Sequence, residues 1–327
     1  MMPTKNQLPE MSHLRQLGKT DLFITPIGFG SWALGGGGWK FGWGPQDDRE
    51  SIAAIQRALD LGVNWIDTAA AYGLGHSEEV VAQALKGRHD HPFIFTKCSM
   101  PWDDQGNLLR SLKAGSIRRE LEDSLRRLQV DVIDLYQVHW PIPDDQLEEG
   151  WATLGELKRQ GKVRYIGASN FSVAQLRRAG SLAHVDALQP PYSLIRRDVE
   201  REILPYCQEQ GIGVIVYSPM ASGLLSGGMD RLRIESLPAG DWRRNSSQFQ
   251  EPKLSQNLRI ADQLKEVGQR HGRSAGEVAI AWTLRHPAVT AAIVGARTPA
   301  QVDGFIGAMD FRLSEAEIDE IGAFLQS

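Results

Sequence analysis

The chain has 327 residues, of which 42% are hydrophobic and 23% charged, and 36 Lys and Arg against 40 Asp and Glu leave a formal net charge of −4. This balance lacks the basic excess that holds a nucleic acid backbone, so we expect no nucleic acid partner. No apolar run approaches the roughly 18 residues of a transmembrane helix; the N-terminus lacks a secretory signal, and we therefore expect a cytoplasmic protein without a membrane partner.

The N-terminal region predicts a flexible segment followed by a β-hairpin. Residues 1–13 are expected to be flexible. Beyond them, LRQLG and LFITP flank the turn-forming KTD, which is the pattern of a short hairpin. In a closed barrel, such a hairpin can cover the bottom.

Strand-like and helix-like segments alternate from residue 27 to the end of the chain. Several expected strands are continuous apolar runs, as in a parallel sheet that is buried on both faces. The eight expected strands are residues 27–29, 64–67, 93–97, 133–139, 165–168, 187–189, 213–217 and 291–294. Eight strands that each precede a helix predict a single α/β domain over residues 1–327, a (β/α)₈ TIM barrel, with an extra C-terminal helix near residues 315–325.

Helix signals occur between the strands. SIAAIQRALDLG has apolar residues at helical spacing, and SIRRELEDSLRRL is amphipathic. Thr298 followed by Pro299 predicts another helix start. Capping boxes are expected at Ser172 with Gln175, Ser274 with Glu277, and Ser314 with Glu317.

Two long segments follow expected strands and should therefore lie over the same face of the barrel. Residues 31–48 contain GGGG and three tryptophans, and residues 218–255 mix Gly, Pro, Arg and Ser. Loops of this length in a compact domain are usually functional or mobile.

A glycine motif and two cysteines point to other site types, which we reject. GFGSWA at residues 28–33 fits the G-x-G-x-x-A pattern of classical dinucleotide folds, but LGGGGWKFGWGP follows it where that motif requires a helix. Cys98 and Cys207 lie far apart in sequence and are expected to be reduced thiols. No metal-ligand spacing is present, so no metal site is expected.

Polar residues lie at or just past the ends of three apolar runs. Asp67 ends NWID, Lys97 ends FIFTK, His139 ends DLYQVH, and Tyr72 follows Asp67 closely. Barrel enzymes carry their reactive groups at the C-terminal ends of several strands, so these four side chains should meet at one rim.

This group of residue types suits carbonyl reduction. Hydride reaches the carbon while the oxygen becomes negative and needs a proton donor. We assign this role to Tyr72 and expect Lys97 to lower its pKa, since attraction between ammonium and phenolate is about 4 kcal/mol at about 4 Å and an effective dielectric of 20. Asp67 would keep Lys97 charged, and a neutral His139 would orient the substrate oxygen.

Each residue also has a structural alternative. Asp67 could cap a loop, Tyr72 could lie in a surface turn, Lys97 and Asp67 could form a structural ion pair, and His139 could be a core histidine. These separate explanations do not account for the placement of all four at one rim, and the catalytic interpretation does.

The same residues carry a resemblance to a known family. DTAAAYG, FTKC and DLYQVHWP, together with LGKTDLFITPIGFGSW, IGASNFS, QPPYSLI, VYSPMASGLLSG and VGARTPAQV, resemble the aldo-keto reductase family over roughly residues 14–312. The resemblance implies a (β/α)₈ barrel that reduces aldehydes or ketones to alcohols with NADPH, returning NADP+, and without a metal. It also implies that the four rim residues are the catalytic tetrad.

The resemblance further implies cofactor-binding positions. Ser169, Asn170 and Gln189 would hold the nicotinamide carboxamide, and Tyr217 would stack on its ring. The loop around the pyrophosphate would contribute Ser218, Met220, Gly223, Leu224 and Ser226, and the adenosine-phosphate end would contribute Gly295, Arg297, Thr298 and Gln301. Backbone N–H groups at the helix start after Thr298 and the guanidinium of Arg297 suit a 2′-phosphate, which favours NADPH over NADH. Arg297 could also be a solvated loop charge.

One departure and the substrate remain open. Residues 303–305 are Asp, Gly and Phe where the family often has Glu-Glu-Asn, which puts the adenine contacts in doubt. We expect a small-molecule carbonyl substrate in a pocket lined by Trp32, Tyr72, Trp102 and Trp140, with Trp39 or Trp43. Alternatively, these tryptophans fasten the long loops. Short hydroxyaldehydes, methylglyoxal and aromatic aldehydes all fit, and the oligomeric state is not readable.

Two other functions stay open. Lys97 could be the nucleophile of a Schiff-base aldolase on the same barrel. The resemblance also extends to regulatory subunits that bind NADPH with little turnover.

Overall fold

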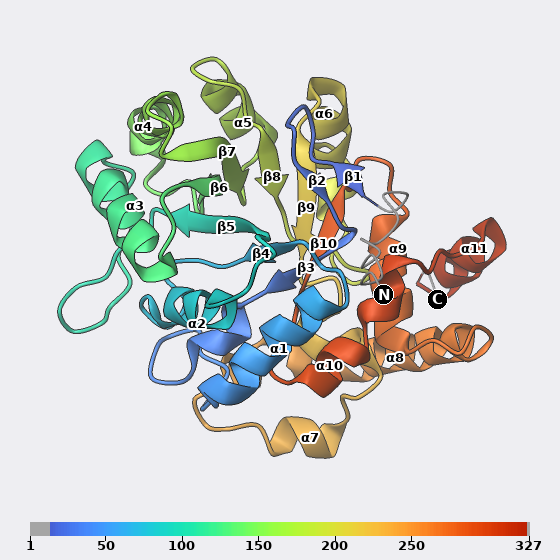
Figure 1. Ribbon diagram of the computed structural model, residues 1–327. Coiled ribbons are helices and arrows are strands. Elements are labelled where there is room, and N and C mark those ends of the chain that lie inside the picture. The colour runs from blue at the N-terminus through green and yellow to red at the C-terminus, as the bar shows by residue number, and fades with distance from the viewer. Residues whose placement is uncertain (1–13, 326–327) are drawn as a thin grey trace, which may run out of the picture.

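The computed structural model describes residues 14–325, and the segment expected to be flexible, residues 1–13, lies outside the described residues. Eight parallel strands form a closed barrel in the order β10-β3-β4-β5-β6-β7-β8-β9 (Figure 1). Their bounds are Ile27–Gly30 (β3), Trp65–Asp67 (β4), Phe93–Cys98 (β5), Ile133–Val138 (β6), Val163–Ser169 (β7), Ala187–Gln189 (β8), Gly213–Tyr217 (β9) and Ala291–Gly295 (β10). The predicted (β/α)₈ barrel is confirmed, whereas the single domain over residues 1–327 stays a prediction.

Helices surround the barrel (Figure 1). They are α1 (Asp48–Asp60), α2 (His76–Leu85), α3 (Ala114–Leu128), α4 (Leu147–Arg159), α5 (Val173–Gly180), α6 (Ile203–Gln210), α8 (Lys253–Gln269), α9 (Ala275–Leu284) and α10 (Pro299–Asp303). The three predicted capping boxes form at the starts of α5, α9 and α11 (Glu315–Phe324), and α11 is the predicted extra helix. Thr298 caps α10, with Pro299 at its first position.

The segment between β9 and β10 differs from its expected form. Residues 218–255 form short helices instead of an open loop: Ala221–Ser226 (η5), Arg231–Glu235 (α7), Trp242–Asn245 (η6) and Ser247–Phe249 (η7). Leu224, Met229, Phe249 and Leu254 pack into a small apolar cluster of their own, which explains why this segment is ordered. The helix α8 that follows it was not predicted.

The N-terminal hairpin closes one end of the barrel, as expected. β1 (Arg15–Gln16) pairs antiparallel with β2 (Phe23–Ile24). The Arg15 guanidinium donates hydrogen bonds to the carbonyls of Val289 and Thr290, just before β10 begins. Side chains of the hairpin pack onto the interior of the barrel in one cluster of Leu17, Leu22, Ile24, Trp65, Phe95, Leu135, Ala187, Ile215, Ala291 and Ile293.

The first glycine of GFGSWA serves the packing of the barrel. A Cβ atom at Gly28 would lie 2.1 Å from the Trp65 ring, so only glycine leaves room for this indole inside the barrel. Trp32–Gly35 (η2), a single short 3₁₀ helix, follows β3 in place of the helix that a dinucleotide motif opens. The rejected dinucleotide fold therefore does not occur here.

Within residues 14–325, none of the helices has the length and apolar character needed to cross a bilayer. In the same part of the chain, no three His, Cys, Asp or Glu side chains gather where they could hold a metal ion. Both Cys98 and Cys207 are buried free thiols.

Candidate active site

A cavity of about 760 Å³ lies at the C-terminal ends of the barrel strands. The last residue of each of six strands lines it, namely Gly30, Asp67, Ser169, Gln189, Tyr217 and Gly295. Tyr72, His139 and aromatic side chains from the following loops complete its wall. The barrel rim that was expected to carry the polar residues therefore forms the wall of this cavity.

The four candidate catalytic residues come together at this cavity. Lys97 Nζ donates to Asp67 Oδ1 at 2.6 Å and to the Thr68 carbonyl at 2.8 Å, and it lies 3.5 Å from the Tyr72 hydroxyl. The rings of Tyr72 and His139 meet edge to face with their centroids 5.6 Å apart. Lys97 is fully buried and does not line the cavity, so it lies behind Tyr72. Asp67, Tyr72 and His139 are the members of this group that line the cavity.

Two glutamines hold Asp67 from the side opposite to Lys97. Asp67 Oδ2 accepts hydrogen bonds from Gln189 Nε2 at 2.8 Å and from Gln137 Nε2 at 3.3 Å. Gln137 was not predicted from the sequence, although its position two residues before His139 in DLYQVH puts it on the same inward face. Gln189 was expected to bind the carboxamide, and in this structure its amide nitrogen faces Asp67.

Burial decides the protonation states at the rim. It raises the pKa of Tyr72 well above its usual value, and the negative charge of Asp67 raises it further. The net pKa of Tyr72 is therefore raised and not lowered, and the contribution expected of Lys97 stays a prediction. Burial, with the nearby charges of Lys97 and Arg110, lowers the pKa of His139 well below its usual value. Tyr72 is therefore a protonated phenol and His139 a neutral imidazole near neutral pH.

A chain of hydrogen bonds connects the ends of β7, β8 and β9. Tyr217 Oη donates to Asn170 Oδ1 at 2.8 Å, and Asn170 Nδ2 donates to the His139 carbonyl at 3.0 Å. Ser169 Oγ donates to the Gln189 carbonyl at 2.9 Å. All four residues expected around a nicotinamide therefore lie together, beside His139.

The loop after β9 forms one wall of the cavity. Ser218, Met220, Gly223 and Ser226 line it, as expected, but the Leu224 side chain is fully buried in the small apolar cluster. Leu224 lies in the expected loop with its side chain packed against Phe249 and its neighbours, and its role in cofactor binding stays a prediction.

Two further residues of that wall were not predicted. Arg243 pairs with buried Asp241 at 2.6 Å and stacks on the Trp43 ring at 4.3 Å from its centroid. Trp242 stacks on Trp32, with the ring centroids 5.3 Å apart. No periodic pattern marks these positions, since they begin η6, a 3₁₀ helix of only four residues.

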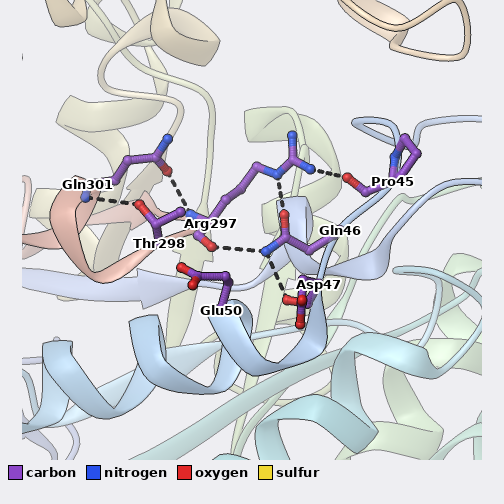
Figure 2. Close-up of a pocket in the computed structure, with 7 residues that line it drawn as sticks. All are labelled: Pro45, Gln46, Asp47, Glu50, Arg297, Thr298 and Gln301. Carbon is purple, nitrogen blue, oxygen red and sulfur yellow. Dashed lines mark hydrogen bonds between the residues drawn. The ribbon is translucent and has the colours of Figure 1, made fainter.

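Arg297, expected at the adenosine-phosphate end of the cofactor, lines the cavity and is hydrogen-bonded to the loop after β3. Its guanidinium donates to the Gln46 side chain and to the Pro45 carbonyl (Figure 2). Gly295, Arg297 and Gln301 line the large cavity, whereas Thr298 lines an adjacent pocket of about 280 Å³. Asp47 and Glu50 line this pocket as well, so carboxylates lie near Arg297 (Figure 2).

The three residues that depart from the family pattern have separate contacts. Asp303 pairs with Arg57 at 2.8 Å on the surface. Phe305 is buried in the main core while it also borders the cavity, and Gly304 lines the cavity too.

Tryptophans form much of the cavity wall. Trp32, Trp39, Trp43 and Trp140 line it, together with Trp242. Trp102 does not line it, which corrects the expected pocket: its ring lies on the Arg127 guanidinium, 5.6 Å from centroid to Cζ, and its backbone bridges to Leu108. The stacked rings of Trp32 and Trp242 also connect the two long loops. This agrees with the alternative that the tryptophans fasten these loops.

Comparisons with known proteins agree with the geometry. A sequence profile of the Aldo/keto reductase family matches residues 26–326. Aldo-keto reductase YhdN of Bacillus subtilis (strain 168) is 37% identical over 311 residues, which cover 94% of this chain and 92% of that protein. NADH-specific methylglyoxal reductase of Escherichia coli (strain K12) is 35% identical over 315 residues, 92% of this chain and 94% of that protein.

A solved structure shows the same similarity. The glycerol dehydrogenase AKR11B4 from Gluconobacter oxydans superposes with a TM-score of 0.87 at 35% identity, covering 96% of this chain and 95% of that one. The family expected from the motifs is thereby confirmed: this chain belongs to the aldo/keto reductase family.

Proposed function

We propose that this protein reduces aldehyde or ketone carbonyls to alcohols with NADPH, and that Tyr72 is its proton donor. The observation that carries the proposal is the position of the Tyr72 hydroxyl, 3.5 Å from Lys97 Nζ and at the wall of the cavity. When bound, the nicotinamide cofactor supplies hydride to the carbonyl carbon.

The residues at the rim have distinct roles in this proposal. Tyr72 donates its proton to the carbonyl oxygen, and the raised pKa of this phenol keeps the proton in place until charge develops there. Lys97 stabilises the phenolate that results, and Asp67 holds Lys97 in position. His139, neutral because burial lowers its pKa, donates an N–H hydrogen bond that orients the substrate oxygen.

The cavity fits a long, anionic dinucleotide. Tyr217 offers an aromatic face beside the amide of Asn170, and Gly223, with φ of 98°, brings backbone close to the cavity. Within the described residues, the indole N–H groups of Trp43 and Trp242 are buried without an acceptor.

NADPH is our proposal for the preferred cofactor because Arg297 borders the far end of the cavity. Asp47 and Glu50 in the adjacent pocket would repel a 2′-phosphate, so we expect the preference over NADH to be modest. The relative from Escherichia coli, whose name calls it NADH-specific, supports measuring both cofactors.

The two other functions are weaker. A Schiff-base aldolase needs a free amine that reaches its substrate, whereas the Lys97 amine is fully buried, binds Asp67 and does not line the cavity. A regulatory subunit with little turnover would need the cofactor-binding residues, but it would not need Lys97 paired with Asp67 next to the Tyr72 hydroxyl.

The test is cofactor consumption with a panel of carbonyl compounds, by wild type and by Tyr72→Phe. The panel includes methylglyoxal and benzaldehyde, with glycerol for the reverse direction, since two relatives are named for methylglyoxal and glycerol. We expect Tyr72→Phe to lower kcat by about 10²–10⁴-fold while NADPH binding is kept. Tyr206→Phe, on α6, is the matched control and should behave like wild type. Turnover of Tyr72→Phe at the wild-type rate would disprove the assigned proton donor.

A further inference from the structure

Arg110 is a cation at the substrate end of the cavity that the proposed reaction does not use. It lines the cavity with Met100, His139 and Trp140. Its positive charge also contributes to the lowered pKa of His139, which lines the same cavity.

The other arginines of the cavity wall have protein acceptors. Arg243 pairs with Asp241, Arg297 donates to Gln46, and Arg233 donates to the Gly228 carbonyl at 3.0 Å. Arg110 differs: its Nη1 is buried, and no acceptor for it exists within residues 14–325. An unpaired buried donor on a charged group is costly, so it calls for an explanation such as a functional role or a bound ion.

The backbone around Arg110 is fixed. The Leu109 N–H donates to the Pro101 carbonyl at 2.7 Å, the Ser111 N–H to the Ser99 carbonyl at 3.4 Å, and the Leu112 N–H to Gln146 Oε1 at 3.0 Å. Arg110 thus projects from a segment that is anchored on both sides, unlike a charge at the tip of an open loop. Such anchoring lowers the entropy lost when the guanidinium binds a ligand.

We propose that Arg110 binds a carboxylate of the substrate, and that the substrates of this enzyme are oxo acids with a carboxylate remote from the reacting carbonyl. The planar guanidinium offers two parallel N–H groups, which match the two oxygens of a carboxylate. The aromatic side chains Trp32, Trp39 and Trp140 line the same cavity and suit the apolar carbon atoms between the two groups. This inference rests on the proposed function, because it takes the carbonyl to lie at Tyr72 and His139.

The test uses pairs of aldehydes that have the same shape and differ in charge. 4-Carboxybenzaldehyde is compared with 4-formylbenzamide, and succinic semialdehyde with 4-oxobutanamide. For wild type we expect a higher kcat/KM for the acid of each pair. In Arg110→Met the ratio of acid to amide should fall by about tenfold or more, mainly through KM, and Arg110→Lys should keep part of it. Arg119→Met changes an exposed arginine on α3 and should leave the ratio unchanged.

Equal losses for acid and amide in Arg110→Met would overturn the inference, as would a wild type that prefers the amides. Calorimetric binding of benzoate and benzamide to the enzyme with NADP+ tests the same contact without turnover. If no carbonyl compound were reduced, the proposed function would be wrong. Benzoate binding that still depended on Arg110 would in that case support the carboxylate site alone. If neutral aldehydes were reduced and benzoate bound no better than benzamide, the inference alone would fail.

Discussion

The two ends of the barrel interior differ sharply although the same strands build both. Near the N-terminal hairpin the inward side chains are apolar, and at the cavity they are polar. On four strands an apolar inward residue is followed two positions later by a polar one: Trp65 by Asp67, Phe95 by Lys97, Leu135 by Gln137, and Ala187 by Gln189. Because side chains alternate between faces, a step of two residues keeps the inward direction and moves about 6.6 Å toward the rim.

This comparison shows how one barrel separates stability from chemistry. The apolar end is closed by Leu17, Leu22 and Ile24 of the hairpin and needs no polar partners. The polar end buries an ion pair, and this is tolerable because Asp67 accepts hydrogen bonds from Lys97, Gln137 and Gln189. Substitutions at the two ends should therefore have different consequences.

Lys97→Met should produce the largest combined effect. It leaves the Asp67 carboxylate buried without its counter-charge, so we expect the free energy of unfolding to fall by about 3–5 kcal/mol. Loss of the ammonium beside Tyr72 should also lower kcat by about 100-fold or more. Denaturant unfolding and steady-state kinetics measure the two effects. Asp67→Asn combined with Lys97→Met should recover stability and not kcat; recovery of kcat would show that the ion pair is only structural.

Phe95→Ala, two residues earlier on β5, should give a loss of stability without a loss of chemistry. Phe95 is fully buried against Trp65, with ring centroids 5.1 Å apart. The cavity left behind should lower the free energy of unfolding by about 3–5 kcal/mol, and the kcat of the folded enzyme should stay near that of wild type. Phe23→Ala in the hairpin is the control, since Phe23 is 49% exposed and should cost far less. A collapse of kcat in Phe95→Ala would mean that the two ends are coupled.

Glu120, a buried carboxyl on α3, should make stability fall as pH rises. Burial raises its pKa from 4.5 to about 7, although it accepts hydrogen bonds from Ser116 Oγ and the Met100 N–H. Between these values the folded protein holds a proton that the unfolded chain releases, so the free energy of unfolding decreases across this window by on the order of 3 kcal/mol.

Unfolding measured from pH 4.5 to 7.5 tests the role of Glu120, with the pH range set by that pKa shift. Glu120→Gln should flatten the slope relative to wild type, whereas Glu122→Gln, an exposed neighbour on α3, should keep it. Identical slopes in Glu120→Gln and wild type would rule out this carboxyl as the source.

The smallest expected effect concerns the adenosine end of the cavity. Glu50→Gln removes an exposed carboxylate near Arg297 and should raise the ratio of NADPH to NADH affinity by about fivefold or less. Arg297→Met should lower the same ratio. Fluorescence titration with both cofactors measures these changes, and Asp60→Asn at the other end of α1 is the control. If Arg297→Met weakened both cofactors equally, Arg297 would have no role at the 2′-phosphate.

Regular elements explain most of what could be predicted before the structure. Asp67, Lys97 and His139 were found because each ends an apolar run, and the capping boxes located the starts of α5, α9 and α11. Prediction failed in irregular backbone. Trp102 was expected in the cavity and instead lies on Arg127. Where no repeat fixes the direction of a side chain, its partners depend on contacts that are distant in sequence.

The sequence by itself determined the strands, the helices between them and the end of the barrel where polar groups gather, because periodic burial and local capping are written in neighbouring residues. Tertiary structure alone decided the environment of those groups. Burial keeps Tyr72 protonated and His139 neutral, and the fold gives Arg110 Nη1 no acceptor among residues 14–325. The reason is physical: desolvation and the distances between charges depend on how all eight strands and their loops enclose the cavity.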